Sequence, residues 1–251
     1  MSTPEILLRG RAITRRWGGL TAVDRVDIDL ARGQVHAVIG TNGAGKSTLI
    51  NILSGEIEPS EGQVELLGQD VTRWSQPRRA RAGLGRSYQR NTIYPSFSVL
   101  ENCRLAAQSR TPAPWALWQS AAACQQSGSA ARAAAERAGL NKVLDREAGL
   151  LSHGQKRQLE IAMCLATAPE VLLLDEPLAG MGAEETDRML ALLAELKQGH
   201  AILLVEHDMD AVFRIADTIT VMVNGAVVAA GSPDHVRNSP EVRAAYLGED
   251  H

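Results

Sequence analysis

The stretch Gly40-Thr41-Asn42-Gly43-Ala44-Gly45-Lys46-Ser47-Thr48 decides the fold of this chain. It fits the pattern G-x-x-x-x-G-K-S/T, whose glycines let the backbone wrap around a polyphosphate with its N–H groups pointing inward. Residues 34–39 predict a buried strand before the loop, and residues 49–53 predict a helix after it, whose positive end would face the anion. Lys46 would place a charge at the β- and γ-phosphates, and Ser47 would supply a hydroxyl to Mg²⁺. Because strand, loop and helix agree, an ordinary glycine-rich turn is the weaker interpretation.

Composition limits the classes to which the protein can belong. The chain has 251 residues, 45% hydrophobic and 22% charged, which is typical of a soluble globular protein with one large domain or a core and a subdomain. Its net charge of -3 argues against a dedicated nucleic-acid binder. No apolar run approaches the roughly 20 residues that cross a bilayer, and residues 1–5 lack the features of a signal peptide. The three scattered cysteines suit a reducing compartment and favour packing over metal binding: Cys103, Cys124 and Cys164.

Two strands are expected before the phosphate loop, over residues 6–13 and 26–30, with a turn at Gly18-Gly19 between them. The second alternates apolar and polar residues, so one of its faces should be buried and the other solvated. Trp17 stands just before the turn. Its ring could stack on a nucleotide base or pack in a core or an interface, and its place in the sequence does not separate these alternatives.

Four arginines gather after a predicted strand over residues 63–67: Arg73, Arg78, Arg79 and Arg81. We expect them on a solvated helix face, with a phosphate-binding or partner surface as the alternative. A further strand is expected over residues 83–89, ending at Gln89.

The middle of the chain, from about residue 99 to residue 167, predicts several helices with a loose polar linker around residues 125–129. Trp115 and Trp118 lie one helical turn apart. We expect them to be buried among these helices, with docking of a partner helix as the alternative.

Two apolar strands end in polar residues. Residues 171–174 are followed by Asp175 and Glu176, and the strand over residues 201–206 is followed by His207. In a doubly wound sheet the ligand lies at the carboxyl ends of the strands, where the phosphate loop already is. Asp175 would therefore hold Mg²⁺, and Glu176 would face the attacking water.

Three further elements surround these strands. Ser152 would cap the helix predicted over residues 155–167. An amphipathic helix is expected over residues 183–196, and a hairpin with an Asn-Gly turn over residues 218–230.

In order along the chain, these segments resemble the ATP-binding subunit of an ABC transporter over essentially the whole length. The resemblance rests on the phosphate loop, Gln89, the signature Leu151-Ser152-His153-Gly154-Gln155, the run at residues 172–176, and His207. A narrower resemblance, to ATPase subunits of importers for branched-chain and other hydrophobic amino acids, amides and urea, rests on residues 16–23, 99–102, 180–185 and 245–249.

The resemblance implies an α/β fold, a P-loop NTPase (RecA-like) core with an antiparallel β subdomain and an inserted α-helical subdomain. Residues 1–251 would form a single ABC ATPase domain. The nucleotide-binding core and β subdomain would comprise residues 1–90 and 168–251, and the helical subdomain with the signature would comprise residues 91–167.

The resemblance also implies roles for individual residues. Glu176 would be the general base, His207 would hold the water and the γ-phosphate, and Gln89 would contact Mg²⁺ or the water and relay their state to the helical subdomain. Lys46 would join these three as the fourth catalytic residue. The expected Mg²⁺ ligands are Ser47, Gln89 and Asp175. The expected nucleotide contacts are Trp17 at the adenine and, at the phosphates, Gly40, Asn42, Gly43, Ala44, Gly45, Lys46, Ser47 and Thr48. Those that would act in trans, on nucleotide held by a partner ATPase, are Ser152, Gly154 and Gln155.

ATP and Mg²⁺ are the cofactors that the resemblance implies. The implied partners are a second, non-identical ABC ATPase subunit arranged head to tail, two transmembrane permease subunits and, indirectly, a solute-binding protein, with no nucleic acid. The protein would be peripheral, on the cytoplasmic face of the inner (plasma) membrane.

Three positions depart from the family pattern. His153 replaces a glycine of the signature, Thr41 replaces a frequent proline, and Gly182 stands where an acid or amide is common. The last departure bears on coupling between two sites in a dimer.

Three alternatives remain in view. A soluble ABC ATPase that acts on nucleic acid or ribosomes usually has coiled-coil insertions or two cassettes, and this chain has neither. A small-molecule kinase would need neither the signature nor His207. A purely regulatory, non-hydrolysing cassette would not need four residues that this chain has, Lys46, Asp175, Glu176 and His207, and their presence argues against that alternative.

Overall fold

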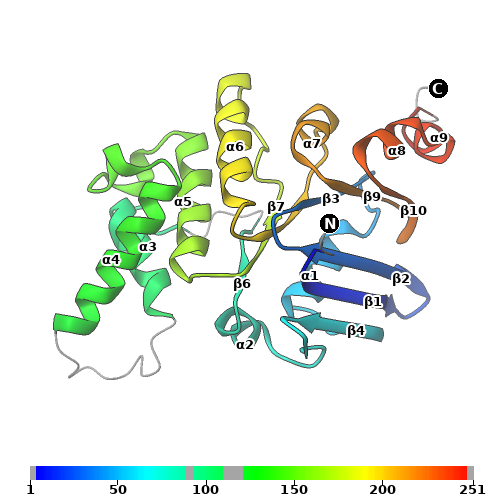
Figure 1. Cartoon of the computed structure of the whole chain (residues 1–251), viewed down its shortest axis with the longest axis horizontal. Helices are drawn as coiled ribbons and strands as arrows, with labels where there is room; N and C mark the ends of the chain where they lie inside the picture. Colours follow the sequence, from blue (N-terminus) through cyan, green and yellow to red (C-terminus); the bar gives the residue numbers. More distant parts are fainter. Residues whose placement is uncertain (1–3, 89–92, 110–120, 248–251) are drawn as a thin grey trace.

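Two β-sheets pack on either side of the helix that follows the phosphate loop, α1 (Lys46–Ser54) (Figure 1). The computed structural model describes residues 4–88, 93–109 and 121–247. The larger sheet has the order β10-β9-β3-β8-β7-β6, and all its neighbours are parallel except β9 and β10. Its strands are β3 (Val35–Gly40), β6 (Leu84–Arg86), β7 (Val171–Asp175), β8 (Ala201–Val205), β9 (Thr218–Val223) and β10 (Ala226–Gly231).

The smaller sheet is antiparallel, with the order β2-β1-β4-β5. Its strands are β1 (Ile6–Trp17), β2 (Leu20–Ala31), β4 (Glu61–Leu66) and β5 (Gln69–Asp70). In β2 the apolar residues Val26, Ile28 and Leu30 are buried between more exposed acids, as their alternation predicts. The expected α/β core with an antiparallel β subdomain is therefore confirmed.

The central strands are buried on both faces, which explains their continuous apolar sequence. Leu173 of β7 packs toward α1 and the smaller sheet, whereas Leu172 and Leu174 pack toward the helices on the opposite face. The buried cluster on that face includes residues of α3 (Val99–Gln108), α4 (Ala121–Arg137), α5 (His153–Ala166), α6 (Ala183–Leu196) and α7 (Met209–Ile215), and α3 and α4 join it by packing against α5. In Figure 1, α3, α4 and α5 form a group at one end of the molecule, with α6 between them and the rest of the core.

Two short helices, α8 (Pro233–Asn238) and α9 (Pro240–Leu247), follow β10 and pack beside it, and α2 (Gln76–Arg81) precedes β6. Over the described parts of the chain, no helix has the length and apolar character that a membrane span requires.

The loose linker expected around residues 125–129 is wrong, because α4 continues through it. Gly128 is the only strong helix breaker in that stretch, and one glycine costs a helix about 1 kcal/mol. The alanines that follow favour the helix, and four of them are buried against α3 and α5: Ala131, Ala134, Ala135 and Ala138.

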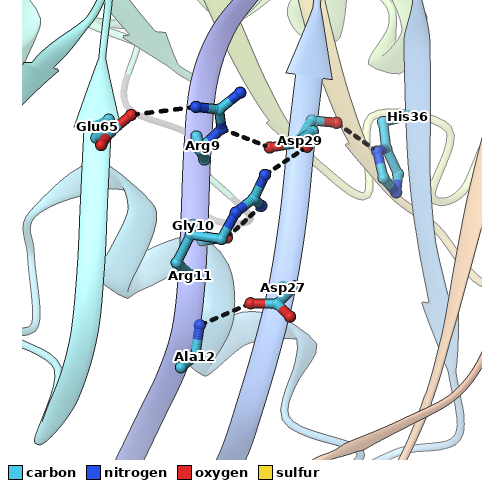
Figure 2. A network of polar contacts seen from close by, with 8 residues as sticks. All are labelled: Arg9, Gly10, Arg11, Ala12, Asp27, Asp29, His36 and Glu65. Carbon is cyan, nitrogen blue, oxygen red and sulfur yellow. Dashed lines mark hydrogen bonds and ion pairs between the residues drawn. The ribbon is translucent and has the colours of Figure 1, made fainter.

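Polar contacts join the smaller sheet to the larger one (Figure 2). Arg9 and Arg11 of β1 both pair with Asp29 of β2, at 3.2 and 2.7 Å. The backbone carbonyl of Asp29 accepts a hydrogen bond from Nδ1 of the buried His36 in β3 (2.8 Å), so Nε2 of that ring accepts from the Thr220 hydroxyl (2.8 Å). Burial lowers the pKa of His36, which keeps the ring neutral in this arrangement.

Arg79 contradicts the expected solvated helix face, because it is completely buried while Arg73, Arg78 and Arg81 are exposed. Its guanidinium donates to the carbonyls of Ile52 (2.7 Å) and Leu53 (2.8 Å) near the end of α1, and to those of Thr72 (2.9 Å) and Trp74 (3.2 Å). The last turn of a helix has carbonyls without intrahelical donors and carries partial negative charge, so a cation there is favourable. Burial lowers the pKa of Arg79 to about 10, which leaves it charged at neutral pH.

Replacing Arg79 with methionine should lower the free energy of unfolding by about 2–5 kcal/mol, because buried carbonyls lose their donors. Chemical denaturation measures the change. Arg81→Met is the matched control, since Arg81 ends the same helix but is exposed, and its effect should stay within about 0.5 kcal/mol. Equal stabilities of the two variants would contradict this role for Arg79.

Candidate active site

Backbone contacts fix the phosphate loop between β3 and α1. A side chain at Gly40 would lie 2.2 Å from the carbonyl oxygen of Met222, and one at Gly45 would lie 2.3 Å from that of Ala22. Gly45 also has φ = +99°, which favours glycine. The Gly225 amide of the β9–β10 turn donates to the carbonyl of Ala44 (3.0 Å). Only glycine fits at positions 40 and 45, so the glycines of the sequence pattern reflect packing as well as ligand binding.

Lys46 begins α1, and its side chain folds back over the loop. Nζ donates to the carbonyls of Gly40 (2.6 Å) and Thr41 (3.1 Å), and the residue is buried. Burial lowers the pKa of Lys46, and the negative charges of Glu176 and Asp175 act in the opposite direction. These two acids therefore lie within electrostatic reach of the loop, as the strand-end argument predicts.

The strand ends beside the loop bring three of the predicted residues together. Asp175 is the last residue of β7 and is buried, and this burial raises its pKa against the nearby positive charge of Arg86. Glu176 follows it, half-buried, with its Oε1 atom 3.7 Å from Nδ1 of the exposed His207. A carboxylate and an imidazole at this separation can act on one water molecule.

The oxygen groups near Lys46 suit Mg²⁺. Asp175 would supply a carboxylate and Ser47 a hydroxyl, which are hard oxygen ligands. In the described part of the chain, no three His, Cys, Asp or Glu side chains gather as a dedicated metal site would require. Few protein ligands are typical of Mg²⁺, which keeps several waters and binds substrate phosphates.

Ser152 forms the predicted cap at the start of α5. Its hydroxyl accepts from the Gln155 amide (3.2 Å), while the Gln155 side chain accepts from the Ser152 amide (3.1 Å). The Ser152 hydroxyl also donates to Glu185 of α6 (3.3 Å). These residues line a hollow of about 390 Å³ with Gly154, Met181 and Arg188, and no residue of the phosphate loop lines it. The signature residues thus lie together, but apart from the phosphate loop of their own chain.

His153, the signature residue that departs from the family pattern, contacts the loop after Glu176. Its Nε2 donates to the carbonyl of Ala179 (2.9 Å), and the ring lies against Gly180. The imidazole is therefore accommodated at the surface rather than displacing the helix start.

The structure says less about the other residues singled out in the sequence. Trp17 ends β1 with 42% of its surface exposed and the Arg15 guanidinium 5.0 Å from its ring centroid, which excludes a buried core role and leaves base stacking or an interface. Gln89, Trp115 and Trp118 lie outside the described residues.

One buried acid in this region is not among the residues predicted from the sequence. Glu206, directly after β8, is completely buried and accepts hydrogen bonds from the amides of Leu178 and His207. An acid that continues an apolar strand of five buried residues is the sequence signal that could have indicated it.

Comparison with protein families agrees with this geometry. The model of the ABC transporter family matches residues 23–179, which is more than half of the chain. The chain belongs to the ABC transporter family. A second family model, the branched-chain amino acid ATP-binding cassette transporter, matches residues 226–251 of the cassette.

Individual relatives cover the cassette from end to end. It is 39% identical to the high-affinity branched-chain amino acid transport ATP-binding proteins BraF of Pseudomonas aeruginosa and LivG of Escherichia coli, over 99% of the cassette and 100% of each relative. The fructose import ATP-binding protein FrcA of Rhizobium meliloti is 34% identical over 86% of the cassette and 85% of that protein.

Solved structures give the same result. A nucleotide-free ATP-binding cassette of an ABC transporter has a TM-score of 0.86 and 30% identity, over 97% of this cassette and 100% of that chain. The ADP conformation of MJ1267, an ATP-binding cassette of an ABC transporter, has a TM-score of 0.85 and 31% identity, over 97% of this cassette and 99% of that chain. The cassette is therefore an ATP-hydrolysing ABC transporter subunit, and the resemblance found in the sequence is confirmed.

Proposed function

We propose that this cassette hydrolyses ATP to drive an importer of branched-chain or other hydrophobic amino acids, or of related amides or urea. The observation that carries the proposal is the end-to-end similarity to BraF and LivG, including a C-terminal segment that matches a model specific to branched-chain amino acid cassettes. A soluble ABC ATPase acting on nucleic acid or ribosomes is the disfavoured alternative.

In the proposed reaction, Lys46 and the N–H groups of residues 40–48 hold the β- and γ-phosphates, and Trp17 stacks on the adenine. Glu176 accepts a proton from a water whose oxygen attacks the γ-phosphorus, and the bond from that phosphorus to the bridging oxygen breaks. His207 orients the water and the γ-phosphate, which its distance of 3.7 Å from Glu176 permits. Mg²⁺, held by Ser47, Asp175 and Gln89, would neutralise charge on the phosphates.

The signature residues Ser152, Gly154 and Gln155 are proposed to act on the nucleotide of a partner cassette. They form the amino end of a 14-residue helix, where N–H groups and the helix dipole favour a phosphate. Because they lie apart from the phosphate loop of their own chain, a head-to-tail dimer with two shared sites is the arrangement that uses both features. We propose that residues 91–167 form the helical subdomain that carries this signature, and that the second cassette is non-identical.

The proposed setting is the cytoplasmic face of the inner membrane. There the two cassettes would bind two permease subunits, and a solute-binding protein would deliver the cargo to the permease. Selection of the solute would then belong to the permease and the binding protein, since the cassette would bind the permease and not the cargo.

The test is to tag this subunit, solubilise membranes gently and identify the proteins that co-purify. We expect two permease subunits and a second, non-identical cassette, and the associated binding protein can then be screened against amino acids, amides and urea. Recovery only from the soluble fraction, together with ribosomes or DNA-repair factors, would contradict the transport function.

A further inference from the structure

One buried side chain joins the two strand ends of the candidate site. Glu206 follows β8, and its carboxylate accepts hydrogen bonds through both oxygens: Oε1 from the Leu178 amide (2.8 Å) and Oε2 from the His207 amide (3.2 Å). Oε2 also lies 3.8 Å from Nδ1 of His207. Glu206 therefore connects the strand end that carries His207 with the loop that carries Glu176.

The position requires a group that only accepts hydrogen bonds. Moving a carboxylate out of water is unfavourable, and burial raises the pKa of Glu206, whereas the bonds from the Leu178 and His207 amides act in the opposite direction. An ionised carboxylate can accept both bonds. A glutamine can accept one of them, but its NH₂ group would then face the other amide, donor against donor.

The loop that Glu206 holds has a backbone conformation that needs support. Glu176 has φ = +49°, a left-handed conformation that side chains other than glycine seldom adopt. Its amide donates to the carbonyl of Val205 (2.9 Å), and two residues later the Leu178 amide donates to Glu206. Consecutive residues at the end of β8 thus fix both ends of this short segment.

We propose that Glu206 is a positioning residue for ATP hydrolysis, whose carboxylate holds the Glu176 loop and His207 in one fixed geometry. The inference rests on the roles proposed above for Glu176 and His207. The hydrogen bonds of the Glu206 carboxylate go to the Glu176 loop and to His207, and not to the phosphate loop. Their loss should therefore slow turnover without weakening ATP binding. A displacement of about 1 Å in an active site can slow a reaction about 100-fold.

The test is the variant Glu206→Gln in the assembled transporter, with the base of the partner cassette silenced so that only the site of this chain turns over. Phosphate release gives kcat and KM, and equilibrium binding of a fluorescent ATP analogue gives the affinity. We expect kcat to fall by about 100-fold while KM and the binding affinity change less than about twofold. Asp217→Asn is the matched control. Asp217 also accepts a backbone hydrogen bond, from the Val35 amide (2.8 Å), but it lies at the amino ends of the strands, opposite to the candidate site. Its kcat should not change.

A second variant separates positioning from stability. If Glu206 acts through His207, the losses caused by Glu206→Gln and His207→Ala should be clearly less than additive in the double variant. An unchanged kcat in folded Glu206→Gln, or equal losses of kcat and ATP affinity, would overturn the inference.

Should Glu206→Gln fail to fold, Glu206→Asp takes its place. It keeps a carboxyl group, but its shorter side chain cannot span both amides, so kcat should fall about 10-fold at constant KM, and an unchanged kcat overturns the inference. Turnover that survives Glu176→Gln would overturn the proposed base instead, so the two failures are distinguishable.

Discussion

Glu176→Gln is expected to reduce ATP turnover at the site of its own chain roughly 10³-fold while ATP binding stays intact. A general base contributes about 10²–10⁴-fold to a rate, and glutamine cannot accept the proton of the attacking water. The groups that hold the nucleotide are unchanged, because Lys46 and the loop backbone do not depend on that carboxylate for their geometry. Two cassettes that close on ATP should then remain closed, since hydrolysis is what reopens them.

The measurement combines phosphate release, from complexes in which the base of the partner cassette is silenced, with size-exclusion chromatography in the presence of ATP. Glu170→Gln is the control, because Glu170 lies just before β7, whereas Glu176 lies just after it. The ion pair between Glu170 and Arg32 is partly exposed, so its loss should have little effect. That variant should hydrolyse ATP at the normal rate. Normal turnover in Glu176→Gln would show that another group is the base.

The sequence predicted the elements whose residues repeat a simple physical pattern. The phosphate loop, the apolar strands β7 and β8 that precede Glu176 and His207, and the α6 helix over Ala183–Leu196 all lie where the pattern indicates. Parallel strands bring their carboxyl ends to one edge, so local sequence was sufficient to place distant residues together.

The sequence was insufficient where the hydrogen-bond partners of a buried side chain lie in a distant part of the chain. Arg79 is buried because α1, more than 25 residues earlier, ends in carbonyls that lack donors. Glu206 accepts from the amide of Leu178, 28 residues away, and nothing in the local pattern of either segment indicates this pairing. Both are charged residues with backbone partners, which hydrophobic periodicity does not detect.

Ser152→Arg is expected to block turnover at the partner's nucleotide while this subunit still binds its own ATP. The small hydroxyl at the start of α5 would be replaced by a long cation, which removes the cap and fills the hollow that Ser152 lines with Gly154 and Gln155. A partner's γ-phosphate would then lose access to the N–H groups at the helix end. The phosphate loop of this chain contributes nothing to that hollow, so its own binding should persist.

Mixed complexes isolate the two sites. When this subunit carries both Ser152→Arg and Glu176→Gln, the remaining site combines the partner's phosphate loop with the altered signature, and turnover should vanish. In the second arrangement this subunit carries Ser152→Arg alone, and the partner's own base is silenced. The remaining site then combines this chain's phosphate loop with the partner's unaltered signature, and turnover should persist. The control is Ser98→Arg, which destroys an equivalent capping box at the start of α3, where Ser98 pairs with Glu101. A loss of turnover only in the second arrangement would place the signature in cis, because the altered residue would then act on its own chain's nucleotide.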